Sequence, residues 1–519
     1  PDVLNVNVTS TLLELYNLTK DKWTEDYYKH KDGSQKEAYS PSDVKRRQLF
    51  IPYAVRNHTG SPVWFAPVTV NPDTQRYSEK RFSESEMTCV PPNQEGTFSF
   101  HRKEKIRHKK SSSLVVNQLI VKVDGWQRLH PVSVDKVGVY FRDTLPDVSK
   151  PSIIKVNDQQ KARVVFDIQQ EGSARKVITL RSALIVSNRL DAPIELKLDN
   201  PIIPGRYDFI TVNSSQQKSI PMPFVLSRLW VRPSDWPVEH SNQAINWQHV
   251  VKPGEVNETL RECRMPDSDA VFRYCVAVRR ENFPEDHFQS GVLPLPGHTV
   301  VIMPPVTVVN LLPIDLHYYF KGTVIAGDVK PGKKSQIPAA DLSSHLELGI
   351  CLENFQICRE LWIPSGTRSY KVKLRLIDSE ERLLEIYLGI LSKLGGSLKL
   401  IVSAPYWIVN RSGLPLVFRQ DGSSQEAAGQ FEENEMARIV SPFLFSFTDK
   451  DSPYLCEMRV GKHKHGPNTI PMWSSSFSLE KEANVRQLHV APKDGNRPDW
   501  LVSARFKARK RFFLPSKCV

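Results

Sequence analysis

The stretch of this chain that comes closest to a known chemical site is rich in glycine and lysine. Residues 327–335 have the sequence Gly-Asp-Val-Lys-Pro-Gly-Lys-Lys-Ser, which nearly matches a phosphate-binding loop. Such a loop needs Ser or Thr directly after its lysine, to hold magnesium, and a helix that follows. Lys334 occupies that position and Pro338 comes soon after, so a helix is not expected. The stretch therefore predicts a Pro-Gly turn between strands.

Two further candidates for metal or catalytic chemistry are incomplete. His463 and His465 alternate on one expected strand face, but no Cys or acidic residue nearby completes a metal site. Cys351 and Cys358 are too widely spaced for a zinc knuckle. The chain has no nucleophile elbow, no His-Glu-x-x-His motif and no dinucleotide-binding fingerprint. We expect a binding protein that is not an enzyme and that uses no metal or cofactor.

Six basic residues form the clearest candidate for contact with an anionic membrane surface. They are Arg102, Lys103, Lys105, Arg107, Lys109 and Lys110. Each basic residue near a charged bilayer contributes roughly 1 kcal/mol, and the alternative interpretation is a solvated loop. Residues 491–519 hold eight Lys or Arg and two Asp, which gives +6 of the net charge of +13. Because the charge is confined to these two segments, nucleic-acid binding is not expected.

The elements between these residues indicate an all-β fold. The 519 residues include 38 Pro against 24 Gly, and short apolar runs alternate with Pro, Gly, Asn and Asp. No apolar run is long enough for a membrane span. Seven widely spaced Cys favour reduced thiols in the cytosol. Residues 380–394 are ambiguous between a helix and two strands.

The first residues differ from the rest of the chain. Residues 3–8 alternate like a strand, and Ser10 stands where a helix N-cap would precede leucines at helical spacing up to Trp23. Residues 25–45 are polar and predict a linker. The chain begins with Pro1 and resembles an excerpt of a longer protein.

A repeated asparagine organises the remaining sequence. Each copy ends a β-branched run, has Gly, Asp or Pro three residues later, and an aliphatic residue six residues later; the copies are Asn57, Asn188, Asn310 and Asn410, spaced by 131, 122 and 100 residues. Asn bonds the backbone two residues on, so the pattern predicts a hairpin turn in each of four β-sandwich-like repeats. Each Asn either stabilises its own turn only or also holds a groove in shape for a peptide.

This pattern predicts six segments. They are a strand-helix segment with linker at 1–45, four β repeats at 46–170, 171–295, 296–396 and 397–492, and an irregular basic tail at 493–519.

The fourth repeat carries a resemblance to a known family. Residues 405–418, Pro-Tyr-Trp-Ile-Val-Asn-Arg-Ser-Gly-Leu-Pro-Leu-Val-Phe, are similar to a signature of the vacuolar protein sorting-associated protein 13 family, which are bridge-like lipid transfer proteins. The resemblance covers roughly residues 48–490 and places them in the family's adaptor-binding domain. Residues 1–24 resemble the end of the lipid-conducting rod. Within the family, the chain resembles the D-type proteins.

The resemblance implies what the chain does. The family's domain captures Pro-x-Pro motifs of organelle-resident adaptors, and so selects the membrane contact site, at a mitochondrion, endosome, lysosome, Golgi or peroxisome. It has six repeats where this chain shows four, and residues 491–519 depart from its pattern. Two alternatives stay open, a structural scaffold that joins the rod to further domains, and binding of anionic membranes through the basic segments.

Overall fold

The structure is a computed structural model, and it divides into two compact units, residues 1–51 and 52–519. It describes residues 13–21, 51–70, 86–100, 116–147, 161–172, 175–199, 205–250, 252, 256–266, 268–281, 297–356, 360–410, 414–430, 442–461, 469–480, 484–492 and 500–506. In the first unit, residues 13–21 form the expected helix, and its leucines are exposed. The predicted strand at 3–8 and linker at 25–45 lie outside the described residues. No described helix is long and apolar enough to cross a membrane.

The second unit is built from strands, and three of its segments share one topology. Repeat 1 (53–182) contains β1 (Tyr53–His58), β2 (Val63–Val70), β3 (Thr88–Val90), β4 (Glu95–Phe98), β5 (Val116–Val123), β6 (Val132–Ser133), β7 (Gly138–Thr144), β8 (Ala162–Glu171) and β9 (Arg175–Ser182). Repeat 2 (184–303) contains β10 (Leu184–Asn188), β11 (Ile194–Asp199), β12 (Tyr207–Val212), β13 (Gln217–Ser219), the short 3-10 helix η3 (Met222–Phe224), β14 (Leu229–Pro233), β15 (Val256–Arg264), β16 (Val271–Arg280) and β17 (His298–Met303).

The third and fourth segments follow directly. Repeat 3 (306–403) contains β18 (Val306–Asn310), β19 (Leu316–Phe320), β20 (Ala326–Val329), β21 (Lys334–Ile337), β22 (Leu346–Cys351), β23 (Leu361–Ile363), β24 (Tyr370–Ile377), β25 (Leu383–Ser392), the 3-10 turn η4 (Leu394–Gly396) and β26 (Leu398–Ser403). Repeat 4 (406–460) contains β27 (Tyr406–Val409), β28 (Leu416–Gln420), β29 (Pro442–Phe445) and β30 (Cys456–Val460). The strands after it are β31 (Thr469–Pro471), β32 (Asn484–Pro492) and β33 (Trp500–Phe506).

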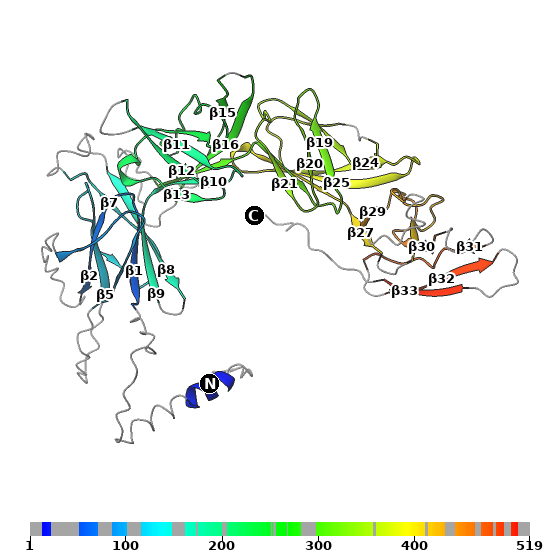
Figure 1. The fold of residues 1–519 in the computed structure, drawn as a ribbon, viewed down its shortest axis with the longest axis horizontal. Coiled ribbons are helices and arrows are strands. Elements are labelled where there is room, and N and C mark those ends of the chain that lie inside the picture. Colours follow the sequence, from blue (N-terminus) through cyan, green and yellow to red (C-terminus); the bar gives the residue numbers. More distant parts are fainter. Residues whose placement is uncertain are drawn as a thin grey trace, which may run out of the picture. The chain divides into compact units, whose positions relative to one another are not determined.

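Each of the first three repeats pairs a five-stranded sheet with a smaller one. The large sheets have equivalent orders, β4-β1-β9-β8-β7, β13-β10-β17-β16-β15 and β21-β18-β26-β25-β24. The small sheet of repeat 1 is β3-β2-β5-β6, and Figure 1 shows β2 and β5 in the layer next to β1, β8 and β9. Apolar residues from both sheets meet in one core, such as Phe65 from β2 and Phe166 from β8. The all-β sandwich architecture predicted from the sequence is confirmed.

Alternation explains why these runs form strands. In β11, buried and half-buried residues alternate along the whole strand, as expected when one face meets a core. All six residues of β17 are buried instead, because this central strand is covered on both faces. The ambiguous segment 380–394 resolves into β25 and η4.

The last strand of each large sheet lies parallel to the first and then leads directly into the next repeat. Asn57 stands opposite Leu180, Asn188 opposite Ile302, and Asn310 opposite Val402. One residue separates β9 from β10, and two separate β17 from β18. Consecutive repeats therefore share a nearly continuous strand, and we propose repeat units that end after β9, β17 and β26, at residues 182, 303 and 403.

Two expectations from the sequence are wrong. The segment after residue 492 is not irregular throughout, because Trp500–Phe506 form β33 and pair with β32. The asparagine-led connections are not hairpins: β1 and β2 belong to different sheets, as do β10 and β11, and β18 and β19. Each connection crosses from one layer of the sandwich to the other, which a local sequence pattern cannot distinguish from a hairpin.

Candidate functional site

The asparagine of repeat 1 holds the connection between its two sheets. We call residues 57–62 the Asn57 connection. The Asn57 side-chain amide donates to the carbonyls of Ser61 (2.7 Å) and Val90 (2.9 Å). Its Oδ1 accepts from the backbone N–H of Thr59 (2.9 Å) and from the Thr59 hydroxyl (2.7 Å). One fully buried side chain therefore ties β1, the connection and β3 together.

Repeats 2 and 3 reproduce the bonds that the Asn57 side chain makes to the backbone. The amide of Asn188 donates to the carbonyl of Ala192 at 2.9 Å, and that of Asn310 donates to the carbonyl of Ile314 at 2.8 Å. In both repeats the Oδ1 accepts the N–H two residues on, at 2.9 and 2.8 Å. The same amides donate a second bond to the end of a neighbouring strand, from Asn188 to the Val212 carbonyl and from Asn310 to the Val329 carbonyl. Asn410 repeats the first bond, with its amide donating to the Leu414 carbonyl at 2.5 Å.

The burial of these side chains fixes what they can do. Asn57, Asn188 and Asn310 are fully buried, so they shape the surface of each connection from beneath. A ligand would meet the backbone that they hold, and would not meet the amides themselves.

At the first junction between repeats, the Asn57 connection receives a segment of repeat 2. The Ser219 hydroxyl donates to the His58 carbonyl (2.9 Å), and the Met222 N–H donates to the Thr59 carbonyl (2.7 Å). Met222 is buried in the core of repeat 1. Pro221 lies so close to Gly60 that a Cβ added to this glycine would come within 2.3 Å of the proline Cβ.

At the second junction, the Asn188 connection (residues 188–193) meets polar partners. Gln336 donates to the Arg189 carbonyl (3.1 Å) and accepts from the Asp191 N–H (2.9 Å). The Lys334 ammonium pairs with the Asp191 carboxylate at 2.9 Å. Gln336 is the equivalent of Ser219, because each stands opposite the residue three before its repeat's asparagine.

The proline that follows at the second junction contacts another element. Arg273 of β16 donates its backbone N–H to the Pro338 carbonyl (2.8 Å) and its guanidinium to the Ala339 carbonyl (2.9 Å). The segment after β21 thus packs against β16. The equivalent segment of repeat 2, in contrast, docks on the Asn57 connection.

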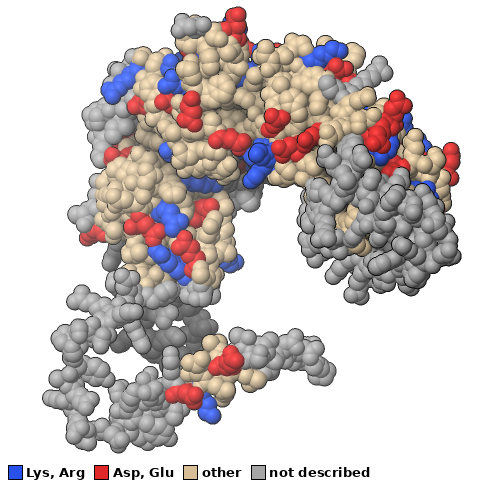
Figure 2. All heavy atoms as spheres, turned by 45° about the vertical axis from the view of Figure 1, so that its right-hand side comes forward, with Lys and Arg blue, Asp and Glu red and all other residues tan. Residues whose placement is uncertain are grey.

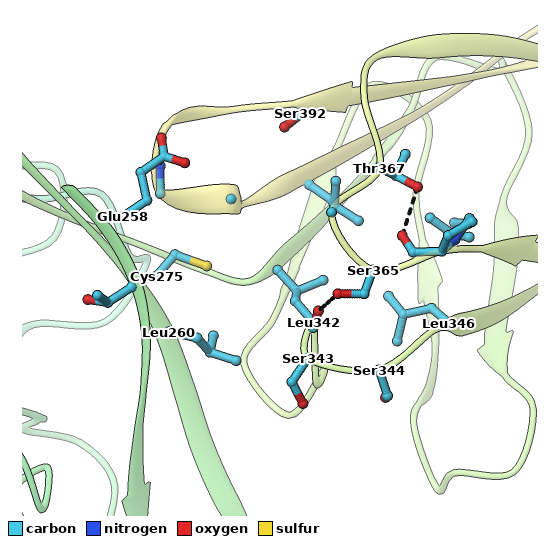
Figure 3. A pocket seen from close by; sticks show the side chains of 17 residues that line it. Glu258, Leu260, Cys275, Leu342, Ser343, Ser344, Leu346, Ser365, Thr367 and Ser392 are labelled. Atoms are coloured by element: carbon cyan, nitrogen blue, oxygen red, sulfur yellow. Dashed lines mark hydrogen bonds between the residues drawn. The ribbon is translucent and has the colours of Figure 1, made fainter. Parts of the chain in front are cut away.

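A cavity of about 370 Å³ lies between repeats 2 and 3. Figure 3 shows Glu258, Leu260 and Cys275 of repeat 2 on one side, and the loop of Leu342 with the loop of Ser365 on the other. Its apolar lining consists of Leu260, Leu342, Leu346, Ile363, Pro364 and Leu398. Serine and threonine side chains surround these, from residues 259, 343, 344, 365, 367 and 392.

The chemistry of this lining suits binding. Glu258 is the only charged residue, and its Oε1 accepts the N–H of Gly395 at 2.8 Å. Burial raises the pKa of the Cys275 thiol to about 12, with a further increase from Glu258, so the thiol stays protonated near neutral pH. The cavity also lies beside β15, which pairs only with β16 among the described strands. An edge strand next to an apolar hollow can accept an extended peptide.

The other candidates from the sequence are resolved or fall outside the described residues. Residues 330–333 form the predicted turn between β20 and β21, where the Gly332 N–H bonds the Asn310 carbonyl. No cluster of three metal-ligating side chains occurs among the residues that the structure describes. His463 and His465 lie outside them, as does the basic set Arg102, Lys103, Lys105, Arg107, Lys109 and Lys110. On the face in Figure 2, basic and acidic side chains are interspersed.

Sequence reasoning missed the cavity and the first junction. The only local signal for the cavity was the Gly-Gly pair at 395–396. In the structure both glycines have positive φ, and Gly395 packs against Cys275. The only signal for the first junction was the tripeptide Pro221-Met222-Pro223. Neither pattern has a distinctive spacing, so neither could be assigned without the fold.

Comparison with known proteins identifies relatives. The family described as "Vacuolar-sorting associated protein 13, adaptor binding domain" matches residues 102–510. This match includes much of the segment 491–519, which the sequence pattern had set apart.

The chain is 38% identical to the human Intermembrane lipid transfer protein VPS13D over 98% of its length. It is 32% identical to the Drosophila melanogaster Vps13D over 95% of its length, and 24% identical to the VPS13 of Chaetomium thermophilum over 80%. The similarity to D-type proteins expected from the sequence is confirmed. The chain spans only 13% of the human protein and 12% of the fly protein.

Proposed function

The chain belongs to the family of vacuolar-sorting associated protein 13 adaptor-binding domains, and on that premise we propose that it recruits a lipid transfer protein to organelle contact sites by binding adaptor peptides. The peptides are short, extended and carry a Pro-x-Pro motif. A proline-rich segment is extended before it binds, so it loses little conformational entropy on docking. The module acts by binding, without catalysis.

The observation that supports this proposal is the cavity between repeats 2 and 3. It combines an edge strand, β15, with an apolar floor and a rim of hydroxyl groups. An extended peptide can add its backbone to such an edge and place alternate side chains in the hollow. The cavity volume, about 370 Å³, lies within the range of roughly 300–1,000 Å³ that ligand pockets occupy. The four signature asparagines support the site indirectly, by holding the connections that space the repeats.

The test is a titration of the whole chain with a fluorescently labelled Pro-x-Pro peptide. Ser344 is exposed at the rim of the cavity, so Ser344→Trp should fill the hollow and weaken binding at least tenfold. Ser379 is an exposed serine on the turn before β25 and does not line the cavity, which makes Ser379→Trp the matched control. Equal loss in both variants would place the site elsewhere. Absence of saturable binding to the unmodified chain would favour the scaffold alternative.

A second candidate function, binding to anionic membranes, is supported by the sequence of residues 102–110. Six basic residues in nine give a local charge that would attract acidic lipids at roughly 1 kcal/mol each. Flotation with phosphoinositide vesicles tests it. Reversing the charges of this cluster should abolish flotation in low salt, and flotation that persists would exclude these residues as the contact.

A further inference from the structure

We propose that the Asn57 connection is a receptor for Pro-x-Pro segments, and that this chain fills it from within by its own Pro221-Met222-Pro223. The inference rests on the ligand class of the proposed function, but it concerns a different surface. It makes repeat 1 a recognition unit whose ligand is supplied by repeat 2. An adaptor motif that adopts the conformation of this segment, extended at its first proline and then turning as in η3, would reach this surface only by exchange with the internal segment.

The hydrogen bonding fits the donors that a Pro-x-Pro tripeptide offers. Proline has no backbone N–H, so the central residue carries the only donor of the motif. This donor is the Met222 N–H, and it bonds the Thr59 carbonyl at 2.7 Å. The acceptor is held in place because Asn57 binds both the N–H and the hydroxyl of Thr59. The signature asparagine thus positions the carbonyl that reads the motif.

The shape of the connection fits the first proline. Gly60 has a φ of +77°, and a Cβ at this position would lie 2.3 Å from the Pro221 Cβ and 2.9 Å from its Cα. Real Cβ atoms do not approach other atoms this closely, so the proline ring occupies the space that a side chain at residue 60 would take. Glycine is therefore needed both for the backbone conformation and for the proline.

The central residue anchors the segment. Met222 is fully buried among the core residues of repeat 1, although it belongs to repeat 2 in the chain. Val225 enters the same core one residue after η3. This burial removes the apolar Met222 side chain from water, which favours the docked state of the segment.

The second connection lacks this glycine and makes different contacts. The residue equivalent to Gly60 is Asp191 in repeat 2 and Pro313 in repeat 3. At Asp191 the following repeat supplies Gln336 and Lys334, and its proline, Pro338, contacts Arg273 instead. Of these first two connections, the one with glycine receives the proline and the one with aspartate does not.

The experiment uses the whole chain with its internal ligand removed. In the triple variant Pro221→Gly, Met222→Ser, Pro223→Gly, a labelled peptide of residues 219–225 should bind saturably. The unmodified chain should bind this peptide at least tenfold more weakly, because a tethered segment competes at an effective concentration of about 1 mM. Adding Gly60→Ala to the triple variant should remove binding, whereas adding Gly322→Ala should not. Gly322 has a φ of +75° with no atom within 4 Å of an added Cβ, so it controls for backbone strain.

The outcomes separate this inference from the proposed function. Binding by the triple variant that is lost with Gly60→Ala and kept with Ser344→Trp supports a receptor in repeat 1. Equal binding of a peptide with both prolines replaced by alanine would overturn the Pro-x-Pro specificity, and so would indifference to Gly60→Ala. If the triple variant does not fold, the docking is tested instead by hydrogen exchange of chains that carry a single glycine substitution and keep residues 221–223. Gly60→Ala should then speed exchange of the Met222 amide at least tenfold relative to Gly322→Ala, and equal rates would reject the docking.

Discussion

The first two junctions between repeats use equivalent strands for different contacts. Between repeats 1 and 2, the segment after β13 places Pro221 on Gly60 and buries Met222 in the neighbouring core. Between repeats 2 and 3, Lys334 and Gln336 of β21 make an ion pair and a hydrogen bond with Asp191, and the segment after β21 contacts Arg273. A cavity of about 370 Å³ lies at this second junction.

The difference teaches that one residue in each connection decides how a repeat meets the next. Where it is glycine, an apolar segment fits closely against the connection. Where it is aspartate, the side-chain carboxylate pairs with Lys334, and the backbone N–H of the same residue bonds Gln336. The asparagine beneath is the same in both, so it sets the shape of the connection and leaves its chemistry to the residue three positions later.

Removal of an asparagine should have the largest effect on this comparison. Asn57→Ala deletes two donors and leaves the Thr59 N–H buried without its acceptor, so we expect a loss of about 3 kcal/mol in the unfolding free energy of repeat 1. Hydrogen exchange of the β1 and β9 amides measures it. Asn257→Ala, on the exposed face of β15, should leave exchange unchanged. A loss below about 1 kcal/mol would mean that the asparagine does not hold the connection.

A pH dependence of intermediate size should distinguish the repeats. His298 stands opposite Leu184, in the register position that Leu398 has opposite Val306. Burial lowers the pKa of His298, and Arg280 and Arg163 lower it further, against a hydrogen bond from its ring to the Val250 carbonyl. The unfolded chain therefore takes up a proton first as the pH falls.

The stability of repeat 2 should accordingly be complete above pH 6.5 and decline as the pH falls toward the folded pKa, by up to about 1.4 kcal/mol per pH unit. His298→Leu should remove part of this decline when hydrogen exchange is compared at pH 7.5 and 5.5. A further part is expected from His240, whose pKa burial lowers to about 4. An unchanged decline in His298→Leu would assign the whole dependence to other groups.

The smallest effect is expected at the surface of the second junction. The Lys334 and Asp191 side chains are each about half exposed, so their ion pair should contribute only about 0.2–1 kcal/mol. Lys334→Ala should lower the thermal midpoint slightly in low salt and not at all in 1 M salt, where such charges are screened. A large decrease in the thermal midpoint that does not depend on salt would show that this contact stabilises the junction through packing, as the burial of Met222 does at the first junction.

Much of the fold could be predicted because its signals are local. The runs at 271–278 and 370–377 became β16 and β24, and the leucines after Ser10 became the helix at 13–21. The apolar segment 224–231 has the sequence of a single strand, but η3 ends at Phe224 and β14 begins only at Leu229. Pro221 and Met222 act there through contacts with a different repeat, which no local pattern reports.

The sequence by itself determined the class, the count of asparagine connections and the family, because strand alternation and turn residues act within a few positions. Only the tertiary structure decided that each connection crosses between sheets, since the partners of Asn57 and Asn188 include Val90 and Val212, which are 33 and 24 residues away. The tertiary structure likewise decided what each connection meets. Gly60 and Asp191 differ by one side chain, and the contacts at these two positions involve residues of the following repeat, Pro221 and Lys334.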